Sequence, residues 1–222
     1  MTDFAAARRN MVESQVRPNG ITDRRIIAAI EAVPREDFVP ESRRALAYMD
    51  EDVPLDHHDR ALGQRALIEI MAFARMLQHA AIKPTDKLLI IGAGTGYGAA
   101  VAAQIAATVV ALESDAGLAH HARSNLRGLA NVKLVEGPLA GGVAAEQPFD
   151  VILLEGRAED VPQSLIDQLA DGGRLIGVVG ERETSQACIY SRSGGLVAVR
   201  PVFDASVTAL PGLKKKKPAF VF

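Results

Sequence analysis

The sequence predicts an α/β fold in which a mainly parallel sheet carries helices on both faces. From residue 86 onward, short apolar runs alternate with helical stretches. Continuous apolar runs are typical of parallel strands that are buried on both sides. Near the end, the strand-like runs 187–191 and 196–203 are joined only by the stretch RSGG. Because that link is too short for a crossover helix, these two runs predict an antiparallel hairpin.

The first eighty residues read as helical and irregular, with several proline- and glycine-containing turns. Thr22 or Asp23 is expected to cap a helix that continues to Glu31, because isoleucines recur there at helical spacing. Residues 64–80 predict a second helix with an apolar face. This region therefore forms an N-terminal helical extension to the sheet.

The remaining elements follow in alternation. The expected parallel strands are 87–91, 108–112, 132–136, 150–154 and 174–179. The expected helices are 97–107, a stretch after Glu113 that continues to 127, and 162–170. With the hairpin, the prediction is a seven-stranded sheet.

Composition limits the classes of partner. The chain has 222 residues, 48% of them hydrophobic, and a net charge of −2, so no overall field favours nucleic acid or an anionic membrane. The apolar runs are too short to cross a bilayer, and the N-terminal residues lack the apolar core of a signal peptide. The single cysteine, Cys188, suits a reducing compartment. We expect a cytoplasmic protein without a nucleic-acid or membrane partner.

The loop after the first parallel strand reads IGAGTGYG, and glycines there let the backbone approach a ligand closely. The dinucleotide pattern GxGxxG fails from Gly92, because Tyr97 takes the last position, and from Gly94 it ends in Ala99. The form GxGxG from Gly92 is common in S-adenosylmethionine (SAM) methyltransferases. Glu113, at the end of the second strand, is placed to accept both ribose hydroxyls, and the terminal hairpin favours the methyltransferase sheet. The alternative is that the glycines only make a tight turn.

Several segments, in this order, resemble the protein-L-isoaspartate O-methyltransferases, which repair damaged aspartyl and asparaginyl residues. They are MVESQVRPNGITDRRIIAAIEAVPREDFVP, AYMDEDVPL, LLIIGAGTGYGAAVAA, FDVILLEG and QLADGGRLIGVVG. The resemblance covers nearly the whole chain. It implies a Rossmann-like SAM-methyltransferase fold, with residues 1–80 as a helical extension and substrate-side cap and residues 81–222 as the SAM-binding domain.

The resemblance also implies an activity and a cofactor site. The reaction would move a methyl group from SAM to the side-chain carboxylate of an L-isoaspartyl residue, leaving S-adenosyl-L-homocysteine. A carboxylate is already ionised at pH 7, so positioning and desolvation would supply most of the catalysis, without a general base. The implied cofactor-binding residues are Gly92, Ala93, Gly94, Thr95, Gly96, Tyr97, Glu113, Pro138 and Leu139.

The sequence departs from this family where the substrate would bind. Family members usually carry Gly-Gln-Thr-Ile-Ser-x-Pro, whereas residues 63–69 read GQRALIE, so both hydroxyls and the proline are absent. Without the proline, the helix 64–80 is expected to run from its start. In addition, Ile90 replaces a first-strand glutamate, the Gly-Asp-Gly after the third strand has become Gly137-Pro138-Leu139, and Glu155 replaces a threonine after the fourth strand.

Gln64, Arg65 and Glu155 are the substrate-side candidates. Glu155 would repel a carboxylate substrate in a partly desolvated site. Arg65 could offset that charge, either as a fork on the substrate carboxylate or by pairing with Glu155 and plugging the pocket. The simpler alternative is that both are solvated surface charges.

Two charged runs have simple interpretations. Asp56-His57-His58-Asp59 offers four potential metal ligands, but neighbours on an extended loop point to opposite sides, so we predict a loop over the cleft and no metal. Lys214–Lys217 is expected to be a solvated turn or tail, with contact to an acidic partner as the alternative.

Three functions remain open on sequence grounds. The first is methylation of isoaspartyl carboxylates in proteins or peptides. The second is methylation of another substrate, such as an amine or cation that Glu155 would attract. The third is a non-catalytic member that uses the fold for binding or assembly. Nothing in the sequence indicates an oligomeric state.

Overall fold

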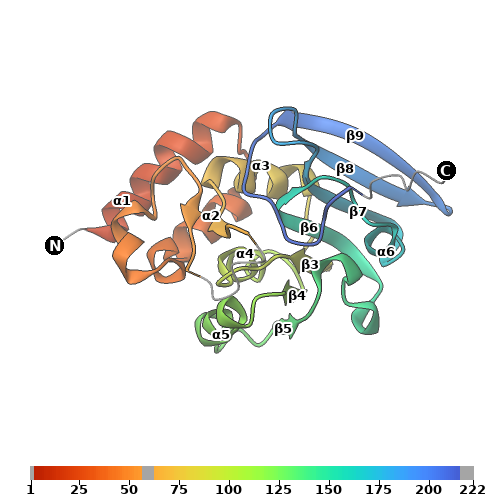
Figure 1. Cartoon of the computed structure of the whole chain (residues 1–222). Coiled ribbons are helices and arrows are strands. Elements are labelled where there is room, and N and C mark those ends of the chain that lie inside the picture. The colour runs from red at the N-terminus through yellow and green to blue at the C-terminus, as the bar shows by residue number, and fades with distance from the viewer. Residues whose placement is uncertain (1–2, 57–62, 216–222) are drawn as a thin grey trace.

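The computed structural model describes residues 3–56 and 63–215 and has a seven-stranded sheet at its centre (Figure 1). The strand order is β5-β4-β3-β6-β7-β8-β9. The strands are β3 (Lys87–Ile91), β4 (Thr108–Glu113), β5 (Val132–Glu136), β6 (Phe149–Ala158), β7 (Leu169–Val179), β8 (Gln186–Ser193) and β9 (Leu196–Asp204). Neighbouring strands from β5 to β7 are parallel, whereas β8 and β9 are antiparallel to their neighbours. The predicted parallel sheet with a terminal antiparallel hairpin is confirmed.

Alternate side chains of the strands enter two separate apolar cores, so the sheet is covered on both faces. One core packs Leu88 and Ile90 against α3 (Ile70–Ala80), α4 (Tyr97–Ala102) and α5 (Ala116–Asn125). The other packs Leu89 and Ile91 against α6 (Gln163–Ile166) and the segment after β9. This division follows from the period of two along each strand.

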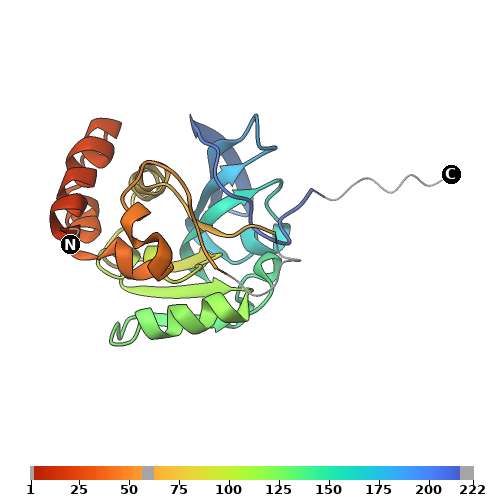
Figure 2. The same ribbon diagram turned by 60° about the vertical axis from the view of Figure 1, so that its left-hand side comes forward.

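The N-terminal helices lie at one side of the sheet, away from β8 and β9 (Figures 1 and 2). They comprise α1 (Phe4–Met11), α2 (Arg24–Ala32) and short helical turns at Val12–Val16, Arg17–Asn19, Arg35–Phe38 and Glu41–Leu46. Asp23 caps α2, as predicted, by accepting a hydrogen bond from the Arg25 N–H at 2.9 Å. Their apolar side chains belong to the same core as those of α3 and α4. The division at residue 80 stays a prediction.

The predicted helix over 64–80 is wrong for residues 64–69. Residues Ala66–Leu67 form strand β2, which pairs antiparallel with β1 (Val53–Pro54), and α3 begins only at Ile70. The Leu55 N–H donates to the Arg65 carbonyl at 2.8 Å, which extends this pairing. Asp52 then accepts from the Glu69 N–H at 2.8 Å, at the start of α3. Pairing with residues ten to fourteen positions earlier in the sequence overrides the local helical pattern.

Two other helices are shorter than predicted. Helix α4 ends at Ala102, because the chain must turn to begin β4, where the Ala107 N–H donates to the Asp86 carbonyl. Helix α6 covers only four residues, and β6 and β7 are each longer than the apolar runs that predicted them.

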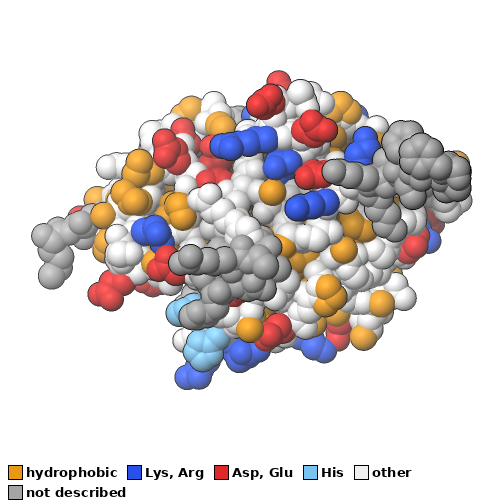
Figure 3. Space-filling model, in the orientation of Figure 1, with side chains coloured by type: hydrophobic (Ala, Val, Ile, Leu, Met, Phe, Trp, Pro, Cys, Tyr) orange, Lys and Arg blue, Asp and Glu red, His pale blue; other side chains and the backbone are white. Residues whose placement is uncertain are grey.

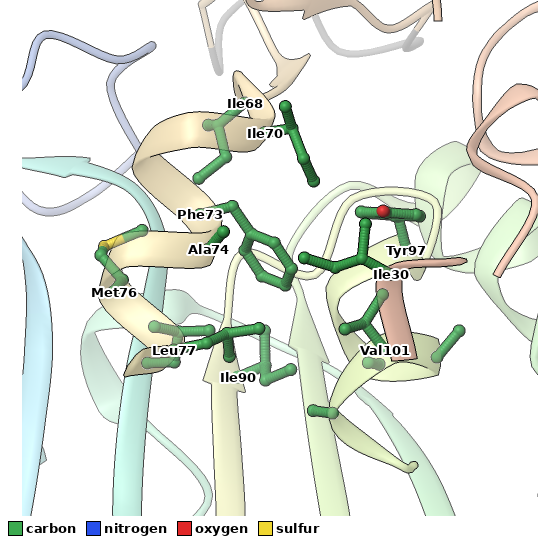
Figure 4. Close-up of a cluster of buried hydrophobic side chains, with 14 of the residues drawn as sticks. Ile30, Ile68, Ile70, Phe73, Ala74, Met76, Leu77, Ile90, Tyr97 and Val101 are labelled. Carbon is green, nitrogen blue, oxygen red and sulfur yellow. The ribbon is translucent and has the colours of Figure 1, made fainter. Parts of the chain in front are cut away.

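Figure 4 shows the centre of the core, where α3 packs against β3 and α4. Ile90 lies fully buried in this cluster with Phe73 and Leu77, so the position where the family commonly has glutamate is part of an apolar core. Among the described residues, no helix is long and apolar enough to cross a membrane.

Candidate functional site

The glycine loop joins β3 to α4 at the carboxyl edge of the sheet. Gly92, Gly94 and Gly96 all have positive φ, at 81°, 57° and 98°, a backbone region that strongly favours glycine. A Cβ added to Gly92 would lie 2.4 Å from Cδ2 of Leu210, so glycine also permits this close contact. The segment that carries Leu210 is held by β6, since the Leu210 N–H donates to the Arg157 carbonyl at 2.8 Å.

Glu113 lies at the end of β4 with its carboxylate directed at the glycine loop. Its Oε2 accepts from the Gly94 N–H at 2.7 Å, and its Oε1 accepts from the backbone N–H groups of Ser114 and Asp115. Arg65 supplies two further donors, with Nη1 at 2.6 Å from Oε1 and Nη2 at 2.7 Å from Oε2. Arg65 is 2% exposed and Glu113 is fully buried, so this is a bidentate ion pair inside the protein.

The predicted pairing of Arg65 with Glu155 is therefore wrong, as is the alternative of two solvated charges. Glu155 is itself 4% exposed, on β6, and its Oε2 has no hydrogen-bond partner. A Cβ on Gly98 would lie 2.3 Å from that Oε2, so the carboxyl group packs against the backbone of α4. The bidentate geometry of Glu113 explains the choice of partner, because both of its oxygens face the guanidinium.

Burial raises the pKa of Glu155 to about 8, although Arg35 and then Arg65 act to lower it. Arg35 is fully buried, and its guanidinium lies 4.8 Å from the centre of the Tyr97 ring. Because Glu155 is largely protonated at pH 7, it would repel a carboxylate substrate far less than its sequence position suggested.

This pKa predicts a pH-dependent contribution to stability. Between the ordinary pKa of 4.5 and about 8, the folded protein holds a proton on Glu155 that the unfolded chain releases. Stability should therefore fall as pH rises through this range, by at most about 1.4 kcal/mol per pH unit. Relative to Glu155→Gln, wild type should lose free energy of unfolding between pH 5 and 8 in urea titrations. Parallel pH profiles for the two proteins would contradict this.

The other predicted cofactor residues lie around the same edge, in two different environments. Pro138 and Leu139 line a cavity of about 460 Å³ together with Ser114, Pro211 and Gly212. Ala93, Thr95 and Tyr97 are buried, and Thr95 and Tyr97 contact the N-terminal extension. Thr95 donates its hydroxyl to the Phe38 carbonyl, and the Tyr97 ring packs between Phe38 and Phe73. The N-terminal extension therefore contacts the glycine loop directly, whereas the cavity at Pro138 and Leu139 is lined by the segments after β4, β5 and β9.

Gln64 lines a larger cavity of about 910 Å³, which segment 206–212 also lines. Its charged lining residues are of both signs: Asp50, Glu51, Asp52, Glu69, Arg157, Arg182 and Lys214. Burial, together with Asp52 and Asp50, raises the pKa of Glu69 to about 7. Basic and acidic side chains are likewise interspersed over the face seen in Figure 3. This cavity is the candidate substrate side.

Sequence reasoning missed the residues that assemble this edge. Arg35 lies in a stretch of charged residues that does not distinguish it from its neighbours. Leu210 follows the last strand, with no motif around it. Asp52 joins the start of α3 to the C-terminal segment, because it also accepts from the Thr208 N–H and hydroxyl, both at 2.7 Å. The only sequence feature that includes Asp52 is the segment AYMDEDVPL, which resembles the family. His57, His58 and Asp59 lie outside the described residues, so the prediction for that run stays a prediction.

Comparison with known proteins agrees with this architecture. Residues 7–211 match the family described as protein-L-isoaspartate(D-aspartate) O-methyltransferase. A relative of that name from Koribacter versatilis is 36% identical over 99% of this chain and 97% of its own length. One from Methanoculleus marisnigri is 36% identical over 92% of this chain and 91% of its own length.

Solved structures show the same fold. A protein-L-isoaspartate O-methyltransferase superposes with a TM-score of 0.78 at 24% identity, over 93% of this chain and 67% of its own. A Plasmodium falciparum structure named for the same activity, in complex with S-adenosyl-L-homocysteine, gives 0.75 at 20% identity over 95% and 99% of the chains. The fold and the glycine-loop edge define the SAM-dependent methyltransferase class. Within that class, the chain belongs to the protein-L-isoaspartate(D-aspartate) O-methyltransferase family.

Proposed function

We propose that this protein is a SAM-dependent methyltransferase that acts on the side-chain carboxylate of L-isoaspartyl residues in damaged proteins or peptides. The observation that carries the proposal is the carboxylate of Glu113 at the end of β4, facing a loop of three glycines with positive φ. Family membership over residues 7–211 supports the same reaction. The single cysteine supports a cytoplasmic location.

The chemistry of this donor set fits SAM. Glu113 offers carboxylate oxygens for ribose hydroxyls, and the cavity beside Pro138 and Leu139 offers an apolar wall for a planar ring. The misfit is Arg65, whose guanidinium already binds both Glu113 oxygens. The fit is therefore complete only when that side chain has left. When bound, SAM supplies a methyl group on a sulfonium, ready for in-line displacement by an oxygen nucleophile.

The residues of this chain would position and desolvate the substrate. The cavity lined by Gln64 holds four acidic side chains beside three basic ones, and the groups in it that can bind a substrate carboxylate are Arg157, Arg182 and Lys214. A substrate carboxylate is ionised at pH 7, so the rate would depend on alignment and exclusion of water. Neutral Glu155, with its raised pKa, would leave that carboxylate unopposed.

The experiment is methyl transfer from labelled SAM to a synthetic peptide that contains L-isoaspartate. The same peptide with normal aspartate is the control. We expect incorporation only with the isoaspartyl peptide, and a base-labile product because the new bond is an ester. Equal incorporation into both peptides, or none into either, would contradict the proposal.

A second candidate is a family member that keeps the fold without isoaspartyl methylation, either on another substrate or without catalysis. The specific observation in its favour is the Arg65–Glu113 ion pair at the cofactor carboxylate. SAM binding without transfer to the isoaspartyl peptide would favour a shifted substrate. Absence of SAM binding would favour a non-catalytic role.

A further inference from the structure

With Arg65 bound, the hydrogen-bonding capacity of the Glu113 carboxylate is fully used. A carboxylate offers about four lone-pair sites. Six donors already reach Glu113: the two Arg65 nitrogens, the backbone N–H groups of Gly94, Ser114 and Asp115, and the Ser114 hydroxyl at 3.4 Å. The three backbone donors belong to the loops that form the site, whereas the two from Arg65 come from a residue 48 positions earlier in the chain.

Arg65 places two donors on the Glu113 carboxylate, and the two hydroxyls of a ribose diol would also place two donors there. Arg65 Nη1 and Nη2 each bind a different carboxylate oxygen, at 2.6 and 2.7 Å. Nη2 also lies 3.4 Å from the carbonyl of Gly92, the first glycine of the loop. The guanidinium therefore occupies the side of Glu113 that faces the loop, and a diol cannot bind the same oxygens while it stays there.

We propose that Arg65 sets the cofactor affinity of this protein, because its guanidinium and the ribose of the cofactor compete for the Glu113 carboxylate. The proposal rests on the proposed function, in that it takes SAM as the cofactor. Binding then requires exchange of one pair of donors for another. The apparent dissociation constant is the intrinsic one divided by the fraction of molecules in which Arg65 has left Glu113.

The release of Arg65 needs a movement of its side chain alone. Its backbone carbonyl is held by the Leu55 N–H at 2.8 Å, and Ala66 and Leu67 pair with β1. The preceding residues, Gly63 and Gln64, are exposed and line the larger cavity. The exit that we propose for the arginine side chain is toward that cavity, which leaves the β1–β2 pairing intact.

The test measures S-adenosyl-L-homocysteine binding to the full chain by isothermal titration calorimetry, for wild type and Arg65→Ala. The variant is expected to bind at least about tenfold more tightly, since it has no closed state to open. It should fold, because Glu113 keeps its three backbone donors. Arg65→Lys, which cannot form the bidentate pair, should show an intermediate affinity and serves if Arg65→Ala does not fold.

Arg174→Ala is the matched control. Arg174 also forms a largely buried ion pair, with Asp86 at 2.7 Å, but at the opposite edge of the sheet, where β3 begins. This variant should be less stable than wild type and bind S-adenosyl-L-homocysteine with unchanged affinity. An equal gain in Arg174→Ala would show a general loosening and overturn the proposal.

The outcomes separate this proposal from the proposed function. Equal or weaker binding by Arg65→Ala, with wild type binding well, overturns the role of Arg65 and leaves the methyltransferase function standing. No binding by wild type, Arg65→Ala or Arg65→Lys overturns both. A tenfold gain without methyl transfer to the isoaspartyl peptide supports Arg65 as the competitor and counts against the proposed substrate.

Discussion

Replacing Arg35 by alanine is expected to lower the free energy of unfolding by about 3–5 kcal/mol, which is the scale for truncating a large buried side chain to alanine. Arg35 is 1% exposed; its Nε donates to the Ala47 carbonyl at 2.8 Å and its Nη2 to the Ile68 carbonyl at 2.6 Å. Removing the side chain leaves both carbonyls without this donor and opens a space beside Tyr97. The hydrogen bonds of Arg35 therefore connect residues 35 and 47 to the segment that precedes α3.

Equilibrium unfolding in urea checks this prediction, with Arg17→Ala as the control. Arg17 pairs with Glu13 on the surface, with both side chains about half exposed, so its loss should change stability by less than about 0.5 kcal/mol. If Arg35→Ala cost no more than Arg17→Ala, the buried hydrogen bonds of Arg35 would not contribute as proposed. Arg35→Met, which keeps most of the volume, should fall between the two because only the polar contacts are lost.

Replacing Glu113 by alanine is expected to destabilise the protein by a similar amount, about 3–5 kcal/mol, because it leaves the Arg65 guanidinium buried without its partner. It also removes the acceptor for three backbone N–H groups around the glycine loop. The double variant Arg65→Ala/Glu113→Ala should be more stable than the sum of the single effects predicts, since no unpaired charge remains.

A double-mutant cycle measured by urea unfolding gives the coupling between Arg65 and Glu113. For two residues in direct contact we expect a coupling of about 0.5–3 kcal/mol or more. Arg174→Ala combined with Glu113→Ala should be additive, because the two residues lie at opposite edges of the sheet. Additivity for Arg65 and Glu113 would mean that the ion pair does not persist in solution.

The strands were predictable because their signal is local. Each buried parallel strand is a short apolar run, and 87–91 and 132–136 match the observed strands residue for residue. The glycine spacing after β3 and the acid at the end of β4 are also local, so they predicted the edge at which we propose that the cofactor binds. The short link RSGG fixed the antiparallel hairpin, since no crossover helix fits in it.

The site was less predictable, because its contents depend on which distant segments meet. The helical pattern of 64–69 was genuine, but pairing with 53–55 makes that stretch extended and turns Arg65 inward. Sequence gave Arg65 two candidate partners, the substrate and Glu155, and the observed partner Glu113 was assigned to the cofactor instead. Leu210 and Arg35 carried no signal, since burial of a side chain by a distant loop leaves no periodicity in sequence.

The sequence by itself determined the class of fold, the family and the edge of the sheet where a cofactor would bind. Those properties follow from apolar periodicity, glycine spacing and the order of motifs, all of which act over short stretches of chain. Only the tertiary structure decided that Arg65 binds Glu113 and that Glu155 is buried with a pKa of about 8. The reason is that ion pairing and desolvation depend on distances and burial set by the packed sheet, its N-terminal extension and the segment after β9.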